Sequence, residues 1–537
     1  MTYEKEIPAY ALQVAKAPKT IPCQAIYHTE KLVSPVERQR VQYQFEEDIL
    51  VPDIKEDMAE ILFMDANCTL QPTERKLSAK SDDLLNLSGT IHIQTLYRPE
   101  KTDCLPVAIT SKVPYQYQWH LSCSGPATGY FRCDVRTLEY MIINERKFRI
   151  KVTLEFSCQI FQEQEILFFQ GLEQDKLEMK KEPVSFCCLS TTKKETVEID
   201  AWVELNGAKE TPALLLQQHY TITENYRQVT SEKIVLNGFL YTEFLYQATG
   251  EEREEKLCSQ RDRMEFTQFL PLEKQYRGKK WSLVKTGFDD LGLRAALEKK
   301  EDGTIAFHVE GKLEVTVALY EAREQEMVTD AYHQRQQFVC KFQHQRRTDL
   351  VCASTGEAAF REVIHLPEGT KAEGVVCTRC RPIQWNCNPE KGRLRLTVEV
   401  EAISLWKEET GYQVSKNIFK LQELVEADGV EPEMSITVEL QTKDCRLTLL
   451  GERQIELMGR LCICWEGSRT KRLMLLEEPG FTEGDAERSA AMVITAVDEG
   501  EDLWTLAKRY RTTEEKIRNI NHLEGDLIAG QKLLIAK

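Results

Sequence analysis

The sequence has no long apolar run and no excess of basic charge. No segment approaches the ~20 consecutive apolar residues that a membrane-spanning helix requires, so we expect no membrane insertion. Lysine and arginine together number 70, against 86 aspartates and glutamates, which gives a formal net charge of −16. Because nucleic-acid binding usually needs a basic face, this balance argues against DNA or RNA as a partner. It disfavours anionic membrane surfaces for the same reason.

Signatures of catalysis are missing as well. The sequence contains no G-x-S-x-G, P-loop, dinucleotide-binding or HExxH motif, and its 9 histidines include no close pair. His308 and His365 lie in strand-like stretches, where we interpret them as hydrogen-bonded sheet residues. No nucleophile, base and orienting group stand in a recognisable spacing. We therefore predict a protein that is not an enzyme, with no catalytic residue and no cofactor.

The 17 cysteines are scattered without the spacing of a disulfide framework, which is typical of buried thiols in a reducing compartment. The best metal candidate combines Cys377 and Cys380 with Cys387, but a structural zinc site needs a fourth ligand. Since the segment also has the pattern of a strand, we predict no metal site. Residues 1–8 lack the basic and apolar regions of a signal peptide, so we expect cytoplasmic residence.

The body of the chain repeats an alternating apolar pattern that is typical of half-buried strands. It occurs at residues 89–97, 238–246 and 396–406, and the first two copies begin with glycine and end with tyrosine. Further strand-like segments precede each copy and a closing strand follows it. Regular alternation of helix with strand is absent. The predicted fold class is therefore mainly β, with three tandem units that are sandwich-like or barrel-like.

Residues 491–537 predict a small β-α-α-β module. A first helix is indicated by four apolar residues at the spacing of one helix face, namely Leu503, Leu506, Ala507 and Tyr510. Thr512 followed by Glu515 fits a capping box at the start of a second helix. We expect Asn521 to end that helix in the left-handed conformation.

This module resembles the LysM family. The residues that carry the resemblance are Val497, Gly500, Leu503, Trp504, Ala507, Tyr510, Thr512, Ile517, Asn521, Leu523, Leu527, Gly530, Gln531, Leu533 and Ile535. LysM modules hold polymers of N-acetylglucosamine in a shallow groove between two loops. Placed on this sequence, the resemblance implies a groove for a protein partner or a glycan at Gly500, Glu501, Asp502, Leu503, Trp504, Asn521, His522, Leu523, Leu527 and Ile528.

Two departures from the family pattern count against sugar binding. Thr495 stands where glycan-binding relatives usually have tyrosine, and Glu501 with Asp502 stands where they have Asp-Thr. Trp504 lies off the apolar helix face. It is either an exposed binding anchor or packed beneath the linker or the C-terminal strand, and burial tendencies do not separate the two.

Three β-rich units followed by a LysM-like module resemble the SPOCS-repeat proteins of spore-forming Firmicutes. The lead strand that contains Pro52, the segment 59–62 and the strands ending at Tyr97 and Tyr246 carry this resemblance. The predicted boundaries are an N-terminal arm at 1–40, SPOCS-like repeats at 41–170, 171–330 and 331–476, a linker at 477–490 and the LysM-like module at 491–537.

The resemblance implies a scaffold of spore-envelope assembly, located in the mother-cell cytoplasm at the forespore surface. Its LysM-like module would bind the morphogenetic ATPase of the coat basement layer, and its repeats would bind other spore-coat proteins. The alternative is a protein of the cell wall or cortex that binds peptidoglycan or chitin through the ancestral groove. The sequence leaves open the strand order, the oligomeric state and whether the repeats pack together.

Overall fold

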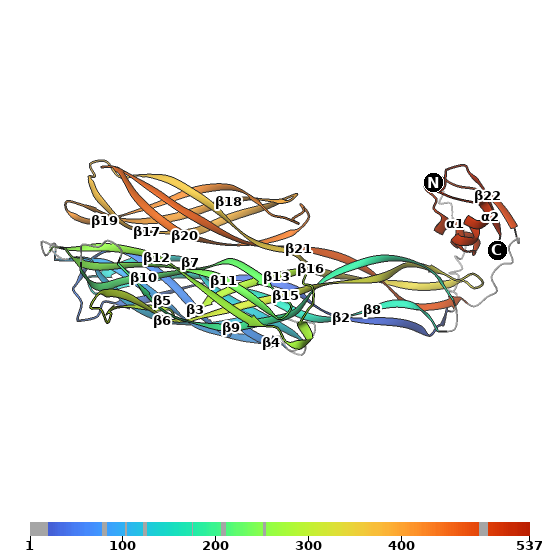
Figure 1. The fold of residues 1–537 in the computed structure, drawn as a ribbon, viewed down its shortest axis with the longest axis horizontal. Helices are drawn as coiled ribbons and strands as arrows, with labels where there is room; N and C mark the ends of the chain where they lie inside the picture. Colours follow the sequence, from blue (N-terminus) through green and yellow to red (C-terminus); the bar gives the residue numbers. More distant parts are fainter. Residues whose placement is uncertain are drawn as a thin grey trace, which may run out of the picture.

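The computed structural model describes residues 20–77, 83–101, 105–121, 126–173, 176–205, 211–250, 254–482 and 492–536. Most of these residues lie in β-strands, which confirms the predicted fold class. Figure 1 shows three sandwich units at one end of an elongated molecule, a narrower stalk beside them, and a small helical module at the far end. In the described part of the chain, no helix has the length and apolar character needed to cross a membrane.

Unit 1, residues 25–172, is a sandwich of two antiparallel sheets with strand orders β2-β8-β7-β4 and β3-β5-β6. In β8, alternate residues from Phe148 to Phe156 are fully buried, as expected when one face of a strand covers a core. The strands are β2 Ala25–Leu50, β3 Met58–Gln71, β4 Glu74–Leu77, β5 Asp83–Pro99, β6 Val107–Leu121, β7 Ala127–Asn144 and β8 Lys147–Leu172.

Units 2 and 3, residues 178–332 and 338–482, repeat this architecture. Unit 2 has β9 Glu178–Val203, β10 Thr211–Val229, β11 Lys233–Thr249, β12 Glu255–Pro271, η1 Lys274–Tyr276, β13 Leu283–Asp290, β14 Arg294–Lys299 and β15 Ile305–Tyr332. Unit 3 has β16 Phe338–His365, β17 Ala372–Glu390, β18 Arg393–Glu408, β19 Gly411–Glu426, β20 Ser435–Gly451 and β21 Gln454–Thr482, and the short β1 Thr20–Pro22 pairs with the end of β21. The C-terminal module has β22 Met492–Ala496, α1 Leu503–Tyr510, α2 Glu514–Asn521 and β23 Lys532–Ala536.

The three units share the arrangement of their long strands, although unit 1 adds the short β4 and unit 2 has two short strands, β13 and β14, where unit 3 has β20. In each, the first strand pairs antiparallel with the last, as β2–β8, β9–β15 and β16–β21. The second sheet of each unit has three strands, and its central strand is β5, β11 or β18. These central strands contain the three repeated segments that the sequence pattern predicts.

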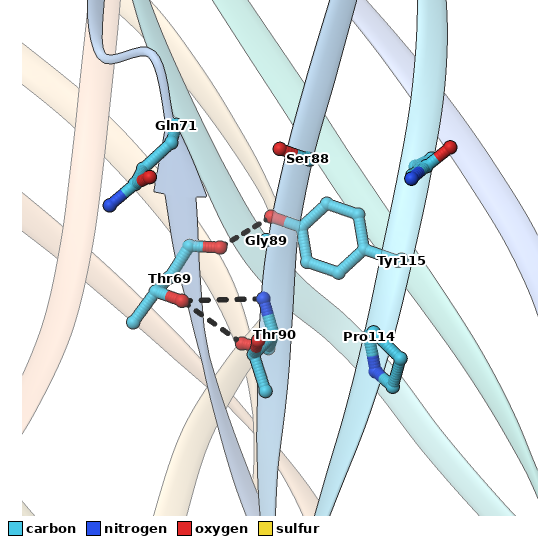
Figure 2. Close-up of a pocket in the computed structure, with 8 residues that line it drawn as sticks. Thr69, Gln71, Ser88, Gly89, Thr90, Pro114 and Tyr115 are labelled. Carbon is cyan, nitrogen blue, oxygen red and sulfur yellow. Dashed lines mark hydrogen bonds between the residues drawn. The ribbon is translucent and has the colours of Figure 1, made fainter.

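The glycines that lead two of the repeated segments lie opposite aromatic residues. Gly89 pairs with Tyr115 and Gly238 pairs with Phe266 on the neighbouring strand. Each ring lies over its glycine, so a Cβ atom added to Gly238 would approach the ring of Phe266 to 2.5 Å. Figure 2 shows the phenol of Tyr115 crossing Gly89 to donate a hydrogen bond to the carbonyl of Thr69, 2.6 Å away. The glycines are thus required by cross-strand packing.

The paired first and last strands continue beyond the sandwiches as two-stranded ribbons, which together form the stalk. Every ribbon leaves its sandwich at a register shift, next to Pro35, Tyr320 or Leu350. Such bulges bend a strand and increase its twist. Apolar residues from all three ribbons share one cluster, which includes Phe168 and Phe186. The ribbons pair residues 25–35 with 161–172, 178–189 with 320–332, and 338–350 with 468–481.

A buried ion pair lies within the stalk. The side chains of Arg347 and Asp349 are 0% and 1% exposed, with the Arg347 Nε donating to an Asp349 carboxylate oxygen at 2.9 Å. The guanidinium also stacks over the ring of Phe186, 5.2 Å from its centroid, and contacts the Cys188 sulfur at 3.4 Å. Unit 3 is thereby held against a strand of unit 2.

The three sandwiches also pack against one another. An apolar cluster takes residues from the three-stranded sheets of all three units, for example Leu96, Leu245 and Leu405. Polar contacts cross the same junctions. The Tyr412 hydroxyl of unit 3 accepts the backbone N–H of Leu257 in unit 2 at 2.8 Å. The repeats therefore form one body, which answers a question that the sequence left open.

The structure differs from the predicted arm and linker at the two ends of this body. Of the predicted arm at 1–40, residues 1–19 lie outside the described residues, and most of the rest forms β1 and the start of β2. Its prolines suggested an extended arm, but Pro35 is tolerated because it sits at a bulge of β2. Of the predicted linker at 477–490, residues 477–482 belong to β21 and 483–490 lie outside the described residues.

Candidate binding site

The C-terminal module is a two-stranded antiparallel sheet covered by two short helices. Val497 and Gly530 extend the pairing of β22 with β23, with the Gly530 N–H donating to the Val497 carbonyl at 2.8 Å. This pairing places the loop before α1, residues 498–502, and the loop after α2, residues 522–531, at the same end of the sheet. Leu506, Ala507 and Ile517 are fully buried beneath the helices, as the predicted helix faces require.

In the first loop, the carboxylate of Glu501 is bonded to other groups of the module. Gly500 has φ of +77°, a left-handed conformation that favours glycine. The Glu501 carboxylate accepts the Asp498 N–H at 3.1 Å and forms an ion pair with Arg509 at 2.6 Å, and the Glu501 side chain is only 4% exposed. Glu501 therefore has a structural role, because its bonds hold the loop against α1.

Asp502 is the N-cap of α1. Its carboxylate accepts the Thr505 N–H at 2.9 Å, a common way to satisfy an unpaired donor at a helix start. Hydrogen bonds from Thr505 lower the pKa of Asp502, with a further contribution from Lys180. Lys180 comes from β9 of the body and lies 3.3 Å from the carboxylate. The next residue, Leu503, is buried in the module core.

The start of α2 differs by one residue from the predicted capping box. Thr513, and not Thr512, is the N-cap and accepts the Lys516 N–H at 3.2 Å. Thr512 is fully buried and its hydroxyl donates to the Ala536 carbonyl at 2.7 Å. Two consecutive threonines offer the same cap chemistry, and the contact with β23 decides which of them turns inward.

The end of α2 also differs from the prediction. His522, with φ of +49°, takes the left-handed position that was expected for Asn521. Asn521 is the last helical residue, and its amide group pairs with Leu534 of β23 through two hydrogen bonds of 2.7 Å. A third bond of 2.9 Å reaches the Ile517 carbonyl. Asn521 thus occupies the free edge of β23 and ties the helix to it.

Replacing Asn521 with alanine is expected to weaken the attachment of β23 to α2. Losing three hydrogen bonds at a half-buried site should destabilise the module by about 1–3 kcal/mol. Hydrogen exchange of the β23 amides, followed by mass spectrometry on the full chain, measures the effect. Asn519→Ala, at an exposed position of the same helix, is the control and should change stability by less than about 0.5 kcal/mol. Equal exchange in the two variants would show that Asn521 does not hold the strand.

The second loop presents an apolar side chain to solvent. Leu523 and Leu527 are half-buried against the module core, whereas Ile528 is 72% exposed. The Gln531 side chain closes the loop by accepting the Ile528 N–H at 3.1 Å. Ile528 is consequently held in a defined turn and points away from the core.

Trp504 contacts the body of the protein. Its indole N–H donates to the carboxylate of Asp330 at 2.8 Å, and its ring meets Tyr332 edge to face with centroids 5.0 Å apart. Asp330 and Tyr332 end strand β15 of unit 2, at the tip of the stalk. Trp504 is half-buried, and the sequence did not predict its contact with the end of β15.

The ten residues of the predicted groove therefore separate into three groups. Glu501, Leu503 and Asn521 are structural, and Asp502 and Trp504 contact the stalk tip. The remaining residues belong to the two adjacent loops: Gly500, His522, Leu523, Leu527 and Ile528. Sequence reasoning missed Lys180, Asp330 and Tyr332, because nothing in a local pattern links them to a helix far along the chain.

The metal and histidine candidates lie in ordinary strand environments. Cys377 is buried where the three units meet, and Cys380 and Cys387 lie farther along β17. Across the described residues, no group of three or more His, Cys, Asp or Glu side chains is arranged to hold a metal ion. His308 bonds to Asp200 and Glu298 at 2.8 and 3.0 Å, which raises its pKa, with the bond to Asp200 contributing most.

A hollow in unit 1 contains hydroxyl and amide groups without an adjacent base. Figure 2 shows it over β3, β5 and β6, beside Gly89 and the ring of Tyr115 that crosses this glycine. The lining residues are Thr69, Gln71, Ser88, Gly89, Thr90, Pro114, Tyr115 and Gln116. No carboxylate, imidazole or thiol is among them, so this lining offers no general base to activate a hydroxyl.

Comparison with known proteins identifies the C-terminal module. The sequence model of the LysM domain matches residues 496–536. No curated protein and no solved structure matches the chain. The chain therefore carries a C-terminal LysM domain, a type of domain that binds glycans or proteins.

Proposed function

We propose that this chain is a non-enzymatic scaffold of spore-envelope assembly. In this proposal its LysM domain binds the morphogenetic ATPase of the coat basement layer and recruits it around the forespore in the mother-cell cytoplasm. The proposal combines the C-terminal LysM domain with the resemblance of the three β units to SPOCS repeats.

The observation that favours a protein over a glycan as the partner is the chemistry of the two loops of the LysM domain. Glu501 and Asp502 of the first loop already accept hydrogen bonds or ion pairs within the chain, so fewer of their acceptors remain for sugar hydroxyls. Ile528 on the second loop is apolar and exposed. An exposed aliphatic side chain held in a defined turn suits an apolar pocket on a protein partner.

The architecture of the body supports a scaffold. The LysM domain lies at the end of the stalk opposite to the sandwiches (Figure 1). One end of the molecule can therefore hold the ATPase while the other contacts further coat proteins.

Peptidoglycan or chitin binding is the second candidate. It is favoured by the LysM match itself and by the two loops at one end of the sheet, the place where LysM domains hold N-acetylglucosamine polymers. In that case the two departures from the family pattern, at Thr495 and at Glu501 with Asp502, would leave enough of the groove intact to bind sugar.

A binding assay on the full chain separates the two candidates. Purified coat ATPase and isolated peptidoglycan are tested side by side against the wild type and Ile528→Asp. We expect ATPase binding that falls about tenfold in the variant, since burying a charge in an apolar contact costs more than 1 kcal/mol. Ile54→Asp, at a 91% exposed loop position of unit 1, is the control and should bind normally. Binding to peptidoglycan alone would contradict the proposed function.

A further inference from the structure

The contact between the LysM domain and the stalk centres on the Asp330 carboxylate, and the ion pair of Lys180 with Asp502 lies beside it. Asp330 accepts the Trp504 indole N–H at 2.8 Å and pairs with Lys508 at 2.6 Å, and a carboxylate oxygen also accepts the Ala331 N–H at 2.9 Å. Asp330 follows a register shift after Val328 in β15. Because a bulge re-aims the side chains that follow it, this irregularity directs the carboxylate toward α1.

Tyr332 completes the contact with an apolar surface. Its side chain is 5% exposed and joins the core cluster of the LysM domain, together with Leu503 and Leu506. Its hydroxyl donates to the carbonyl of Thr512 at 2.5 Å, in the turn between the two helices. Burial raises the pKa of this phenol, so it remains a hydrogen-bond donor at neutral pH.

The stalk residues that contact the LysM domain include the charged Lys180 and Asp330 as well as Tyr332, so the docking surface is partly polar. Apart from Tyr332, the buried residues of this core cluster come from the LysM domain, among them Leu506, Ala507 and Ile517. Between domains, small and partly polar interfaces usually permit relative motion. Attachment to the same chain nevertheless gives a high effective concentration, which keeps even a weak contact populated.

We infer that Asp330 and Tyr332 form a latch that holds the LysM domain against the stalk tip and covers the Trp504 face of α1. With the latch closed, a molecule that approaches this face meets β15. With the latch open, Trp504 and Lys508 lose their bonds to Asp330, and the face of Trp504 becomes available to a partner. The inference goes beyond the proposed function and holds whichever partner the two loops bind.

Nuclear magnetic resonance of the tryptophan indoles tests the latch on the full chain. The chain has 7 tryptophans, and Trp504→Phe identifies the signal of Trp504 among them. In the wild type we expect this indole signal to be displaced by the carboxylate bond and the neighbouring ring. It should also be protected from broadening by TEMPOL, a soluble nitroxide.

Tyr332→Ala and Asp330→Asn should each move that signal toward the position of a free indole. The broadening by TEMPOL should rise about tenfold if the closed form holds about nine-tenths of the wild-type molecules. Glu326→Gln, which breaks an exposed ion pair with Lys181 on the same ribbon, is the matched control and should leave the signal unchanged.

The outcomes of this experiment are independent of ATPase or glycan binding. A Trp504 signal that is already free and broadened in the wild type overturns the latch. So does a protected signal that neither variant moves, because Asp330 and Tyr332 would then not be what covers it. A protected wild-type signal released by both variants supports the latch even if the proposed partner does not bind.

Discussion

Replacing Arg347 with alanine is expected to destabilise the protein by about 3–5 kcal/mol, the usual effect of removing one partner of a buried ion pair. The variant leaves the carboxylate of Asp349, which is 1% exposed, without the guanidinium 2.9 Å away. Lys471, 3.4 Å from the other oxygen, compensates in part. The ring of Phe186 also loses the group stacked on it. Urea denaturation followed by circular dichroism measures the change.

The double variant Arg347→Met with Asp349→Leu is the matched control. It removes both charges and places apolar side chains at the same positions in the centre of the stalk. Because buried ion pairs often contribute little net stability, this variant should unfold close to the wild type. If the double variant is as unstable as Arg347→Ala, the loss comes from packing, and an uncompensated charge is not its cause.

Replacing Gly89 with alanine should have the second largest effect, a destabilisation of about 2–4 kcal/mol. The new Cβ atom would lie 2.5 Å from the Tyr115 hydroxyl oxygen and closer still to the carbonyl oxygen of Thr69. A backbone carbonyl in a paired strand cannot move aside without breaking the ladder. The hydrogen bond from Tyr115 to Thr69 would also be disrupted. Thermal unfolding by calorimetry reports the change.

Gly287→Ala is the control for this prediction. Gly287 also lies in a strand, β13, but the nearest atom to an added Cβ is 4.0 Å away on Thr316. Removing backbone freedom at a position with space should leave stability unchanged or raise it slightly. If both variants lost a comparable amount of stability, the effect at Gly89 would not come from the aromatic ring on the opposite strand.

Much of the β architecture could be predicted because the alternation of apolar and polar residues along a strand is a local property of the sequence. The central strands β5, β11 and β18 were found from alternating apolar residues alone, and the apolar face of α1 was found from its 3.6-residue period. The continuation of β2 to Ala25 was missed because Pro35 is an unfavourable residue for a central strand. In the structure the proline is acceptable because β2 is the edge strand of its sheet and its pairing with β8 has a bulge at that point.

The candidate site was predictable in outline and not in its contacts. The loop positions followed from the resemblance to LysM, but the roles of Asn521 and Thr512 depend on where β23 lies. Asn521 was expected to take a turn conformation, whereas its amide pairs with the edge of that strand. The partner of Trp504 lies 174 positions earlier in the chain, a separation at which local patterns carry no information.

The long final strand of unit 3 has a mechanical consequence. β21 runs from the sandwich through the stalk toward the LysM domain, and it pairs with β16 from His365 opposite Gln454 to Phe338 opposite Phe481. The ladder bonds of antiparallel strands lie perpendicular to the strand direction. Tension applied through a tethered LysM domain would therefore load this whole ladder in shear, so that many bonds resist together instead of opening one by one.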